Sequence, residues 1–286
     1  MQVFSIDRSS PPLGLGRPVA TIGNFDGLHV GHRAVIAQVL ARARAAGERS
    51  LVVTFEPHPV KVLHPGAAFC RLKTLAQRIQ GLEALGVDQV AVVRFDLELA
   101  RLAPEVFAES VLVRTLALGE LWVGPGFRFG HERAGDFARL ESIGAARGFA
   151  TRPAEPVLDQ GRPVSSTRIR EALCQGAIED AARLLGEAYP VEGVVVRGHG
   201  RGRTLGFPTA NLVPDNECLP AEGVYATRVR VRGEERPGAT FLGAPATFGE
   251  NEAVFETHLP GWGGGDLYGE RLLVRFLRRL LRRPAA

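Results

Sequence analysis

Between Val19 and Phe55 the sequence alternates in a pattern that few folds accommodate. The apolar run Val19–Ile22 passes into a glycine turn, an apolar helical pattern follows over Arg33–Ala46, and the β-branched run Ser50–Phe55 comes next. Strand, helix and strand within about 35 residues predict a βαβ unit. Because Ser50–Phe55 shows no polar alternation, it is typical of a strand buried on both faces of a parallel sheet.

The same alternation continues to Gly186. Further helices are predicted over Thr74–Leu85, Ala103–Leu116, Asp136–Arg147, Ser165–Leu173 and Ile178–Leu185, and further strands over Gln89–Phe95, Glu120–Val123 and Phe149–Pro153. We therefore expect an α/β doubly wound parallel sheet. Ligands of such sheets lie beyond the carboxyl ends of the strands, and both Gly23–His32 and Gly124–Gly130 leave strands at those ends.

From Tyr189 onward the character of the sequence changes. The apolar runs become short, alternating and punctuated by glycine, as in Val224–Val231, which is followed by a hairpin-like turn. Several strands of this kind in the last part of the chain predict a small antiparallel β-barrel. We place the domain boundary near Gly186, so that residues 1–186 form one domain and residues 187–286 a second.

Composition excludes some classes of protein. The 286 residues are 45% hydrophobic and 23% charged, as in an ordinary globular protein, and no apolar run reaches membrane-spanning length. The first residues lack the basic start and apolar core of a signal peptide. The three cysteines, Cys70, Cys174 and Cys218, are odd in number and far apart, which fits a reducing cytoplasm. We expect a cytoplasmic protein with no membrane partner.

The basic charge is almost entirely arginine. The net charge is +4, and lysine occurs only at Lys61 and Lys73. The densest basic run is Arg271–Arg283, which we interpret as a solvated strand-plus-helix face or tail. We therefore do not expect nucleic acid as a partner, and no pattern in the sequence sets an oligomeric state.

The stretch Thr21–His32, TIGNFDGLHVGH, is the first candidate site. It reads as the end of a strand, a glycine turn and the start of a helix, whose unpaired N–H groups suit an anion. His29 and His32 are three residues apart and share one helical face. The pair could cap the helix, bind a metal or bind phosphate. A zinc site would need a third ligand, and no Cys, His or carboxylate stands at a suitable spacing. The preceding glycine turn favours the binding of phosphate.

The stretch Ser165–Leu173, SSTRIREAL, is the second candidate site. Ser165, Ser166 and Thr167 are residues that begin helices, but Arg168 and Arg170 follow in the first turns, where cations oppose the helix dipole. A bound polyphosphate would make that arrangement favourable.

A third candidate lies in the second domain. Gly198–Asn211 reads GHGRGRTLGFPTAN, with alternating glycines and arginines that are common in flexible turns. It is neither a Walker A loop nor a dinucleotide fingerprint, because no GK[ST] and no strand–turn–helix unit accompany it. Glu256, in FETHL, is a carboxylate that suits a general base, although taken alone it also fits an ordinary strand residue.

Together these motifs carry a resemblance to a known family. GNFDGLHVGH with SSTRIR resembles the HxGH nucleotidylyltransferase superfamily, whose domain is Rossmann-like. TFEPHP at Thr54–Pro59 and VGPGFRFG at Val123–Gly130 resemble the FMN adenylyltransferase module of the prokaryotic bifunctional riboflavin kinase/FAD synthetase family. GFPTAN, FETHL and the DLYG of Asp266–Gly269 resemble its riboflavin kinase half, a Greek-key β-barrel. The resemblance implies two reactions: riboflavin and ATP give FMN and ADP, and FMN and ATP give FAD and pyrophosphate.

The resemblance also implies roles for the residues of the first domain. His29 and His32 would stabilise the transferred α-phosphate of ATP, while Arg168 and the hydroxyl residues before it would hold the β- and γ-phosphates. The nucleotide-binding residues implied here are Gly23, Asn24, Phe25, Asp26, Gly27, Gly31, Ser165, Ser166 and Thr167. The flavin-binding residues implied are Phe55, Pro57, His58, Phe127 and Phe129.

In the second domain, the resemblance implies that Thr209 and Asn211 bind Mg²⁺ and the phosphates of ATP. The loop folding over the nucleotide would contribute Gly198, Gly200, Arg201, Gly202 and Arg203. Glu256 would be the general base that takes the proton of the ribityl 5′-hydroxyl. The cofactor expected is Mg²⁺ with ATP, and riboflavin, FMN and FAD are substrates or products.

Four stretches depart from the family pattern. Gly126 stands where an acidic or amide residue usually precedes FRFG, and FLGAPATFG at Phe241–Gly249 carries Phe241 and Ala244 or Pro245 in place of Asn and Arg. The loop Gly261–Gly265 is rich in glycine. We also expect the kinase domain to be shortened after its last strand, without the family's C-terminal helix.

These departures leave two alternatives to a bifunctional enzyme. One is an FAD synthetase with a degenerate kinase barrel. The other is a flavin- or nucleotide-binding regulatory protein whose arginine-rich tail binds RNA or a protein. Retention of the side chains that carry chemistry favours catalysis: His29, His32, Arg168, Thr209, Asn211 and Glu256.

Overall fold

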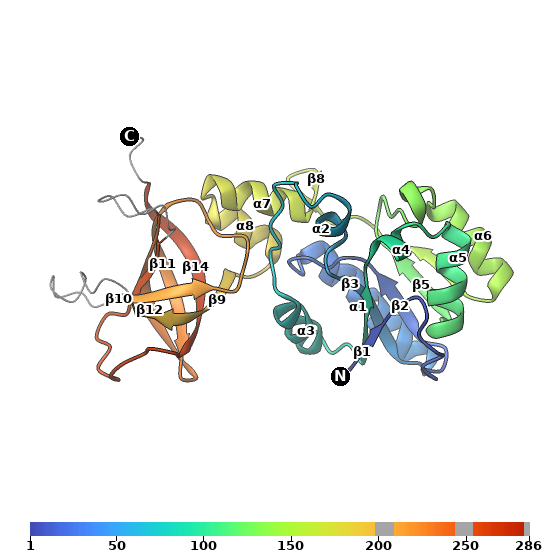
Figure 1. Ribbon diagram of the computed structural model, residues 1–286, viewed down its shortest axis with the longest axis horizontal. Coiled ribbons are helices and arrows are strands. Elements are labelled where there is room, and N and C mark those ends of the chain that lie inside the picture. The colour runs from blue at the N-terminus through green and yellow to red at the C-terminus, as the bar shows by residue number, and fades with distance from the viewer. Residues whose placement is uncertain (198–208, 244–253, 283–286) are drawn as a thin grey trace. The chain divides into compact units, whose positions relative to one another are not determined.

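The structure is a computed structural model that describes residues 1–197, 209–243 and 254–282. The chain divides into two compact units, which are described separately below (Figure 1). The first unit comprises Met1–Phe69 and Leu75–Val164, and the second comprises Cys70–Thr74 and Ser165–Ala286.

The first unit is built on a parallel sheet of six strands in the order β1-β4-β3-β2-β5-β6. The strands are β1 (Gln2–Ile6), β2 (Val19–Ile22), β3 (Ser50–Glu56), β4 (Gln89–Arg94), β5 (Glu120–Val123) and β6 (Ala150–Pro153). The longer helices are α1 (Val30–Ala46), α3 (Leu75–Ala84) and α6 (Phe137–Arg147). Shorter elements are α2 (Pro59–Leu63), α4 (Leu97–Ala100), α5 (Pro104–Phe107), η1 (Ala108–Thr115), η2 (His131–Arg133), β7 (Leu158–Asp159) and β8 (Arg162–Pro163).

This sheet confirms the predicted doubly wound α/β fold. The chain runs outward from β2 through β3 to β4 and then crosses to β5 on the other side of β2. The carboxyl ends of the neighbouring strands β2 and β5 therefore lie at the topological switch point, where open α/β sheets bind ligands. The two motifs that follow these strands, Gly23–His32 and Gly124–Gly130, are brought to this edge.

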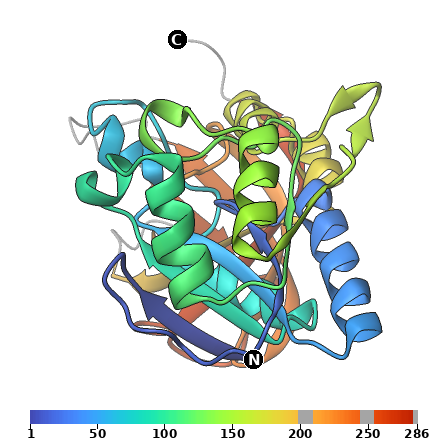
Figure 2. The ribbon, with the colours of Figure 1, turned by 90° about the vertical axis from the view of Figure 1, so that its right-hand side faces the viewer.

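Helices pack on the sheet of the first unit (Figure 2), and apolar side chains lie on both of its faces. On one face Leu51 and Val53 pack with residues of the segments that follow β4, including Leu112 and Leu140. On the other face Val52 packs with Ile36 of α1 and other apolar residues. Burial on both sides explains why β3 shows an unbroken apolar run instead of polar alternation.

The first unit differs from the sequence-based expectations in its short elements α2, α4, η2, β7 and β8, which were not predicted, and in two further features. The strand β1 was not expected, because its short sequence QVFSI has no clear pattern; it pairs in parallel with β4 at the edge of the sheet. The helix expected over Ala103–Leu116 is divided into α5 and the π-helix η1. Thr115 Oγ1 donates to the carbonyl of Ser110, five residues earlier, and this bond supports the wider turn.

The second unit contains a closed barrel of six strands in the order β10-β13-β12-β11-β14-β9, with every neighbouring pair antiparallel. The strands are β9 (Tyr189–Val196), β10 (Thr209–Pro214), β11 (Gly223–Val231), β12 (Glu234–Gly243), β13 (Val254–His258) and β14 (Arg271–Arg282). The predicted small antiparallel barrel is confirmed. Its interior includes three threonine hydroxyls in a hydrogen-bonded chain, 2.9 Å from Thr227 to Thr240 and 3.0 Å from Thr240 to Thr257.

The second unit also includes α7 (Ser166–Gln175), α8 (Ile178–Leu185) and the short segment Cys70–Thr74. The Tyr189 hydroxyl lies 2.9 Å from the Leu72 carbonyl and 2.7 Å from the Cys218 carbonyl, and Lys73 pairs with Glu187 at 2.6 Å. These contacts tie the segment to the barrel. The functional boundary near Gly186 stays a prediction, since compactness alone does not define a catalytic domain.

The basic run at the end of the chain is strand β14 as far as Arg282, instead of a strand followed by a helix. Its arginines have partners within the second unit: Arg275 pairs with Glu235, and Arg279 donates to the carbonyls of Gln175 and Glu222. Across the described residues, no helix combines the length and apolar character needed to cross a bilayer.

Candidate functional site

The turn after β2 is held in a strained backbone conformation. Gly23 N–H donates to the Val53 carbonyl at 3.0 Å, which continues the contact between β2 and β3 past the end of the strand. Beyond it, Phe25 has φ 48°, Gly27 φ 92° and Leu28 φ 49°. Only glycine adopts positive φ readily, so Phe25 and Leu28 keep this shape because their surroundings impose it.

The two histidines lie together at the start of α1. His29 is the N-cap, and its Nδ1 accepts a hydrogen bond from the backbone N–H of His32 at 3.2 Å. The rings are stacked, with centroids 3.5 Å apart and planes 16° apart. Nδ1 of neutral His29 is thus an acceptor, which leaves the proton on Nε2. Nδ1 of His29 therefore caps the helix, which was one of the three roles considered for the pair. The Nε2–H group of His29 is not used in the cap and can donate to a ligand.

Burial keeps this pair uncharged. It lowers the pKa of His29 to about 4, against a smaller opposing effect of a hydrogen bond with the backbone of His29 itself. Burial, together with the neighbouring His29, lowers the pKa of His32 well below its ordinary value. Nδ1 of His32 is buried and has no hydrogen-bond partner among the described residues. A buried polar atom without a partner is rare, and at this place it is consistent with a ligand-binding group.

The rest of the turn packs closely around the histidines. Asp26 is buried, and the Phe25 ring lies 5.1 Å from the ring of His32. A Cβ on Gly31 would lie 3.2 Å from the His29 ring and 3.9 Å from the carbonyl oxygen of Val164. Val164 is the last residue of the first unit, so the end of that unit lies near the histidine pair.

The residues predicted to bind flavin at the end of β3 are partly engaged in local structure. Phe55 packs edge-on against Phe95 with centroids 5.7 Å apart. His58 is buried, caps α2 by accepting from Val60 N–H at 3.2 Å, and packs its ring 4.4 Å from that of Phe69. Pro57 is exposed.

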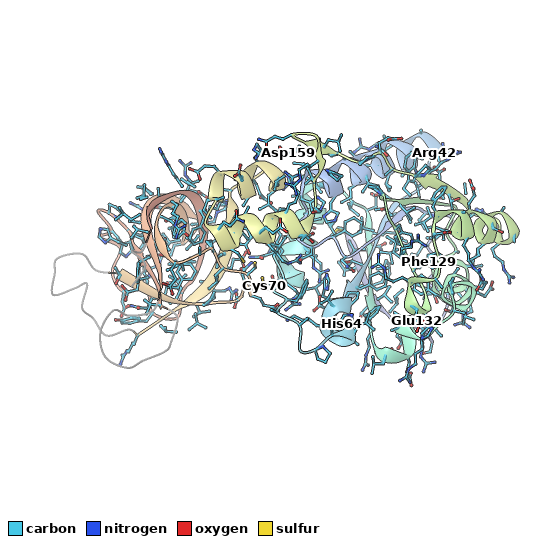
Figure 3. The ribbon with its side chains drawn as sticks, turned by 90° about the horizontal axis from the view of Figure 1, so that it is seen from above. Arg42, His64, Cys70, Phe129, Glu132 and Asp159 are labelled. Atoms are coloured by element: carbon cyan, nitrogen blue, oxygen red, sulfur yellow. The ribbon has the colours of Figure 1, made fainter. Side chains whose placement is uncertain are left out.

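The turn after β5 forms a hollow at the same edge of the sheet. Phe127 and Phe129 stack with centroids 5.6 Å apart, and Phe129, labelled in Figure 3, is buried. The hollow has a volume of about 260 Å³ and is lined by residues that include Gly126, Phe127, Arg128 and Pro153. Gly126 has φ 70°, and a Cβ there would meet no atom within 4 Å. This position is therefore open toward solvent or a ligand.

In the second unit, Ser165 is the N-cap of α7. Its hydroxyl accepts from Arg168 N–H at 3.3 Å. Ser166, Thr167 and Arg168 form the first turn, which contains no acidic residue. The predicted arrangement of a capping hydroxyl followed by a basic first turn is present.

The barrel register brings the predicted kinase residues together. Asn211 on β10 lies directly opposite Glu256 on β13, and Thr209 lies opposite His258. Because side chains alternate between the two faces of a strand, all four of these residues share one face. Phe255 and Thr257, the neighbours of Glu256 along β13, are buried in the barrel. Phe241 on β12 is the other neighbour of Glu256, so the family departure at this position places an aromatic ring beside the predicted base.

Several predicted residues lie outside the described part of the chain. They are Gly198, Gly200, Arg201, Gly202 and Arg203 of the glycine–arginine loop, together with residues 244–249 of the FLGAPATFG stretch. Within the described residues there is no cluster of three or more His, Cys, Asp or Glu side chains that could hold a metal.

Sequence reasoning missed Arg78 of α3. This arginine is 2% exposed and contacts both the turn after β2 and the end of β3. A signal for it exists in the sequence, because Leu75, Arg78 and Leu82 are spaced at i, i+3 and i+7. An arginine in the apolar stripe of a helix must be paired when it is buried.

Comparisons with known proteins cover both units. A family model described as FAD synthetase matches residues 15–168, and one described as riboflavin kinase matches residues 185–284. A bifunctional riboflavin kinase/FMN adenylyltransferase from Pseudomonas fluorescens is 40% identical over 92% of this chain and 84% of its own length. One from Escherichia coli K12 is 38% identical over the same shares. A crystal structure of a Streptococcus pneumoniae protein named macrolide-efflux protein matches 100% of this chain and 93% of its own, with 28% identity and TM-score 0.89.

Proposed function

This chain belongs to the bifunctional riboflavin kinase/FMN adenylyltransferase family, and from that premise we propose which of its residues carry each reaction. The enzyme phosphorylates riboflavin with ATP to give FMN, and it adenylylates FMN with ATP to give FAD and pyrophosphate. The riboflavin kinase match over residues 185–284 supports a bifunctional enzyme and neither of the two alternatives.

The adenylyl transfer is assigned to the histidine pair. An oxygen of the FMN phosphate attacks the α-phosphorus of ATP, the bond to the bridging α–β oxygen breaks, and pyrophosphate leaves. Negative charge accumulates on the oxygens around the α-phosphorus, and hydrogen-bond donors held in place stabilise it. His29 Nε2–H, the ring of His32 and the N–H groups at the start of α1 are such donors. The observation that carries this assignment is the stacked pair, with His29 buried, at the switch point of the sheet.

The remaining residues of this centre have binding roles. Gly23, Asn24, Phe25, Asp26, Gly27 and Gly31 shape the nucleotide loop, and Ser165, Ser166, Thr167 and Arg168 hold the β- and γ-phosphates. A basic first turn without acidic residues supports the second role, because a polyphosphate there offsets the unfavourable placement of Arg168 against the helix dipole. Phe55, Pro57, His58, Phe127 and Phe129 bind the flavin.

The phosphorylation of riboflavin is assigned to the outer face of β10 and β13. Glu256 takes the proton of the ribityl 5′-hydroxyl, whose oxygen then attacks the γ-phosphorus of ATP. Thr209 and Asn211 hold Mg²⁺ with ATP; their oxygen atoms are of the kind that Mg²⁺ prefers, and they share a face with the Glu256 carboxylate. The metal, when bound, neutralises charge on the polyphosphate. The loop residues Gly198, Gly200, Arg201, Gly202 and Arg203 are assigned to the same nucleotide.

We place the enzyme in the cytoplasm, where ATP is available and thiols remain reduced. The three cysteines, all present as free thiols, support this location.

The assignment of the adenylyl centre is tested with a His29→Ala/His32→Ala double variant. With ATP, Mg²⁺ and FMN, the parent enzyme forms FAD, and the variant should be slower by about a hundredfold or more because donors to the transferred phosphate are lost. Chromatography of riboflavin, FMN and FAD measures both reactions in one sample. Phosphorylation of riboflavin should be unchanged, which shows that the variant chain is folded. A double variant as active as the parent would refute the assignment.

Glu256→Gln tests the kinase centre in the same assay. The amide cannot accept the hydroxyl proton, so FMN formation from riboflavin should fall by about a hundredfold or more. FAD formation from supplied FMN should continue at the parent rate. If the parent enzyme makes no FMN from riboflavin, the kinase assignment fails while the adenylyltransferase assignment stands.

A further inference from the structure

Arg78 lies between two loops of the adenylyltransferase centre. Its Nη1 donates to the Asn24 carbonyl and to Thr54 Oγ1, each at 3.0 Å, and lies 3.4 Å from the Phe55 carbonyl. Its Nη2 pairs with the Glu56 carboxylate. Burying a guanidinium is costly unless its donors are paired, and these four acceptors pair with its two Nη groups. They come from the turn after β2 and from the end of β3.

The carbonyl that Arg78 binds belongs to the peptide before Phe25. Phe25 has φ 48°, and Leu28 has φ 49°. Each such residue costs on the order of 1 kcal/mol or more unless the surroundings compensate. The Asn24 carbonyl also accepts from Thr54 Oγ1 at 3.1 Å, so two donors fix the orientation of this peptide.

The same face of α3 also supports the second strained residue. Gly81 follows Arg78 by three residues and shares its face of the helix. A Cβ on Gly81 would lie 2.5 Å from Cδ1 of Leu28, a buried side chain. The face of α3 thus contacts the turn at both of its strained positions, by hydrogen bonding at Asn24 and by close packing at Leu28.

The orientation of the Asn24–Phe25 peptide determines where the histidines lie. The Phe25 ring, 2% exposed, packs with its centroid 5.1 Å from that of His32, and His32 stacks on His29 at 3.5 Å. Rotation of this peptide would carry the Phe25 ring away and remove the support of His32. At its other end Arg78 binds Glu56, which directly precedes the proposed flavin residues Pro57 and His58.

We propose that Arg78 is a positioning residue for adenylyl transfer, which aligns the histidine pair with the flavin-binding end of β3. The proposal rests on the proposed function of His29 and His32. Arg78 acts through the Asn24 carbonyl and the Glu56 carboxylate without contacting the reacting atoms.

The test compares Arg78→Met and Arg78→Lys in the full chain. Arg78→Met should lower kcat/KM for FAD formation by about a hundredfold, since a displacement of about 1 Å in a reacting group costs that much. Arg78→Lys should recover part of this loss, because one ammonium group reaches some of the acceptors but cannot span both loops. Riboflavin phosphorylation, carried out by the other unit, should remain at the parent rate in both variants and report that the chain is folded.

Arg42→Met is the matched control. Arg42 of α1, labelled in Figure 3, binds the buried Glu120 carboxylate at 2.8 Å, at the amino end of β5 and so at the opposite edge of the sheet. This variant also removes an arginine–glutamate pair from the first unit, but it should leave kcat/KM for FAD formation within about twofold of the parent. If Arg78→Met matches this control, the positioning role is refuted.

A milder variant and a second readout keep the test decisive. Thr54→Val is used if Arg78→Met unfolds the first unit, because it removes only the hydroxyl between Arg78 and Asn24. A loss of about tenfold in kcat/KM for FAD formation supports the proposal, and an unchanged kcat/KM overturns it.

The ring NMR signals of His29 and His32 should shift in Arg78→Met and should keep their parent chemical shifts in Arg42→Met. This readout does not require FAD formation, so a parent enzyme without that activity would refute the proposed function and leave the positioning role measurable.

Discussion

In the phosphate site that we propose, the histidine pair acts without charge. Imidazoles are often assigned a positive charge beside phosphates, but burial keeps the pKa of His29 at about 4 and that of His32 well below its ordinary value. At neutral pH the proposed contact of this pair with the α-phosphate is therefore made by N–H dipoles. Preorganised dipoles in a buried site stabilise developing charge effectively because they need no reorientation during the reaction.

The lowered pKa of His29 makes the stability of the fold depend on pH. The folded-state pKa of His29 is depressed, so the unfolded chain binds a proton at a higher pH than the folded chain does. Stability should be unaffected above about pH 6.5 and should fall as the pH drops from there toward 4. For His29 alone, the loss between pH 7 and pH 5 should be roughly 2 kcal/mol in the free energy of unfolding.

Urea unfolding followed by Trp122 fluorescence, in a Trp262→Phe background, measures this loss in the first unit. His29→Gln, which cannot be protonated in this range, should show a smaller fall between the two pH values. An equal fall in parent and variant would mean that His29 does not titrate as its burial implies.

At the scale of elements, the turns that follow strands β2 and β5 form the adenylyltransferase centre that we propose. Each turn uses backbone conformations that ordinary side chains avoid, at Phe25 and Leu28 in the first and at Gly126 in the second. Helix α3 holds the first turn through Arg78. The second turn carries the stacked Phe127 and Phe129 rings and leaves Gly126 open.

Gly126→Asn tests whether the second turn lacks a polar contact to a nucleotide. Asn tolerates the left-handed conformation at φ 70°, and its side chain would meet no atom close to Cβ. One added hydrogen bond is worth about 1 kcal/mol, so the KM for FMN or for ATP in FAD formation should fall about fivefold. Steady-state kinetics with each substrate varied would measure the change.

Gly126→Ala is the matched control for this turn. It introduces the same Cβ without a polar group and should not lower either KM, although strain at positive φ should cost about 1 kcal/mol of stability. Equal KM values in Gly126→Asn and the parent would contradict a missing polar contact.

At the scale of the whole molecule, the second compact unit extends beyond the barrel itself. Helix α8 packs against β9 and β14, and its residues Ile178, Leu184 and Leu185 are buried. Apart from the segment Cys70–Thr74, this compact unit therefore begins at Ser165, whereas the predicted functional boundary lies near Gly186. The two positions define two fragments that differ only by α7 and α8.

A fragment of residues 165–286 should be more stable than one of residues 187–286. Removing α8 exposes the apolar surface that it covers, and the loss of three large buried side chains corresponds to roughly 6 kcal/mol. Differential scanning calorimetry should show a lower unfolding temperature, or no cooperative transition, for the shorter fragment. Equal unfolding temperatures would show that α7 and α8 contribute nothing to the barrel and that the boundary near Gly186 also divides the compact units.

The sequence by itself determined the fold class and the family. Periodicity separates a buried parallel sheet from an alternating antiparallel barrel, because each architecture requires its own pattern of apolar residues. Motifs such as GNFDGLHVGH and GFPTAN identify the two activities through residues that lie close together along the chain. The edge strand β1 and the π-helix η1 were not predicted, because neither has a distinct sequence pattern over so few residues.

Tertiary structure decided what depends on contacts between distant segments. The neutral state of His29 and His32 follows from burial, and the alignment of Asn211 with Glu256 follows from the register of β10 and β13. The role of Arg78 arises because α3 packs its face against a turn that lies some fifty residues earlier in the chain. Local sequence specifies which elements form, whereas charge state and alignment depend on the packing of those elements in space.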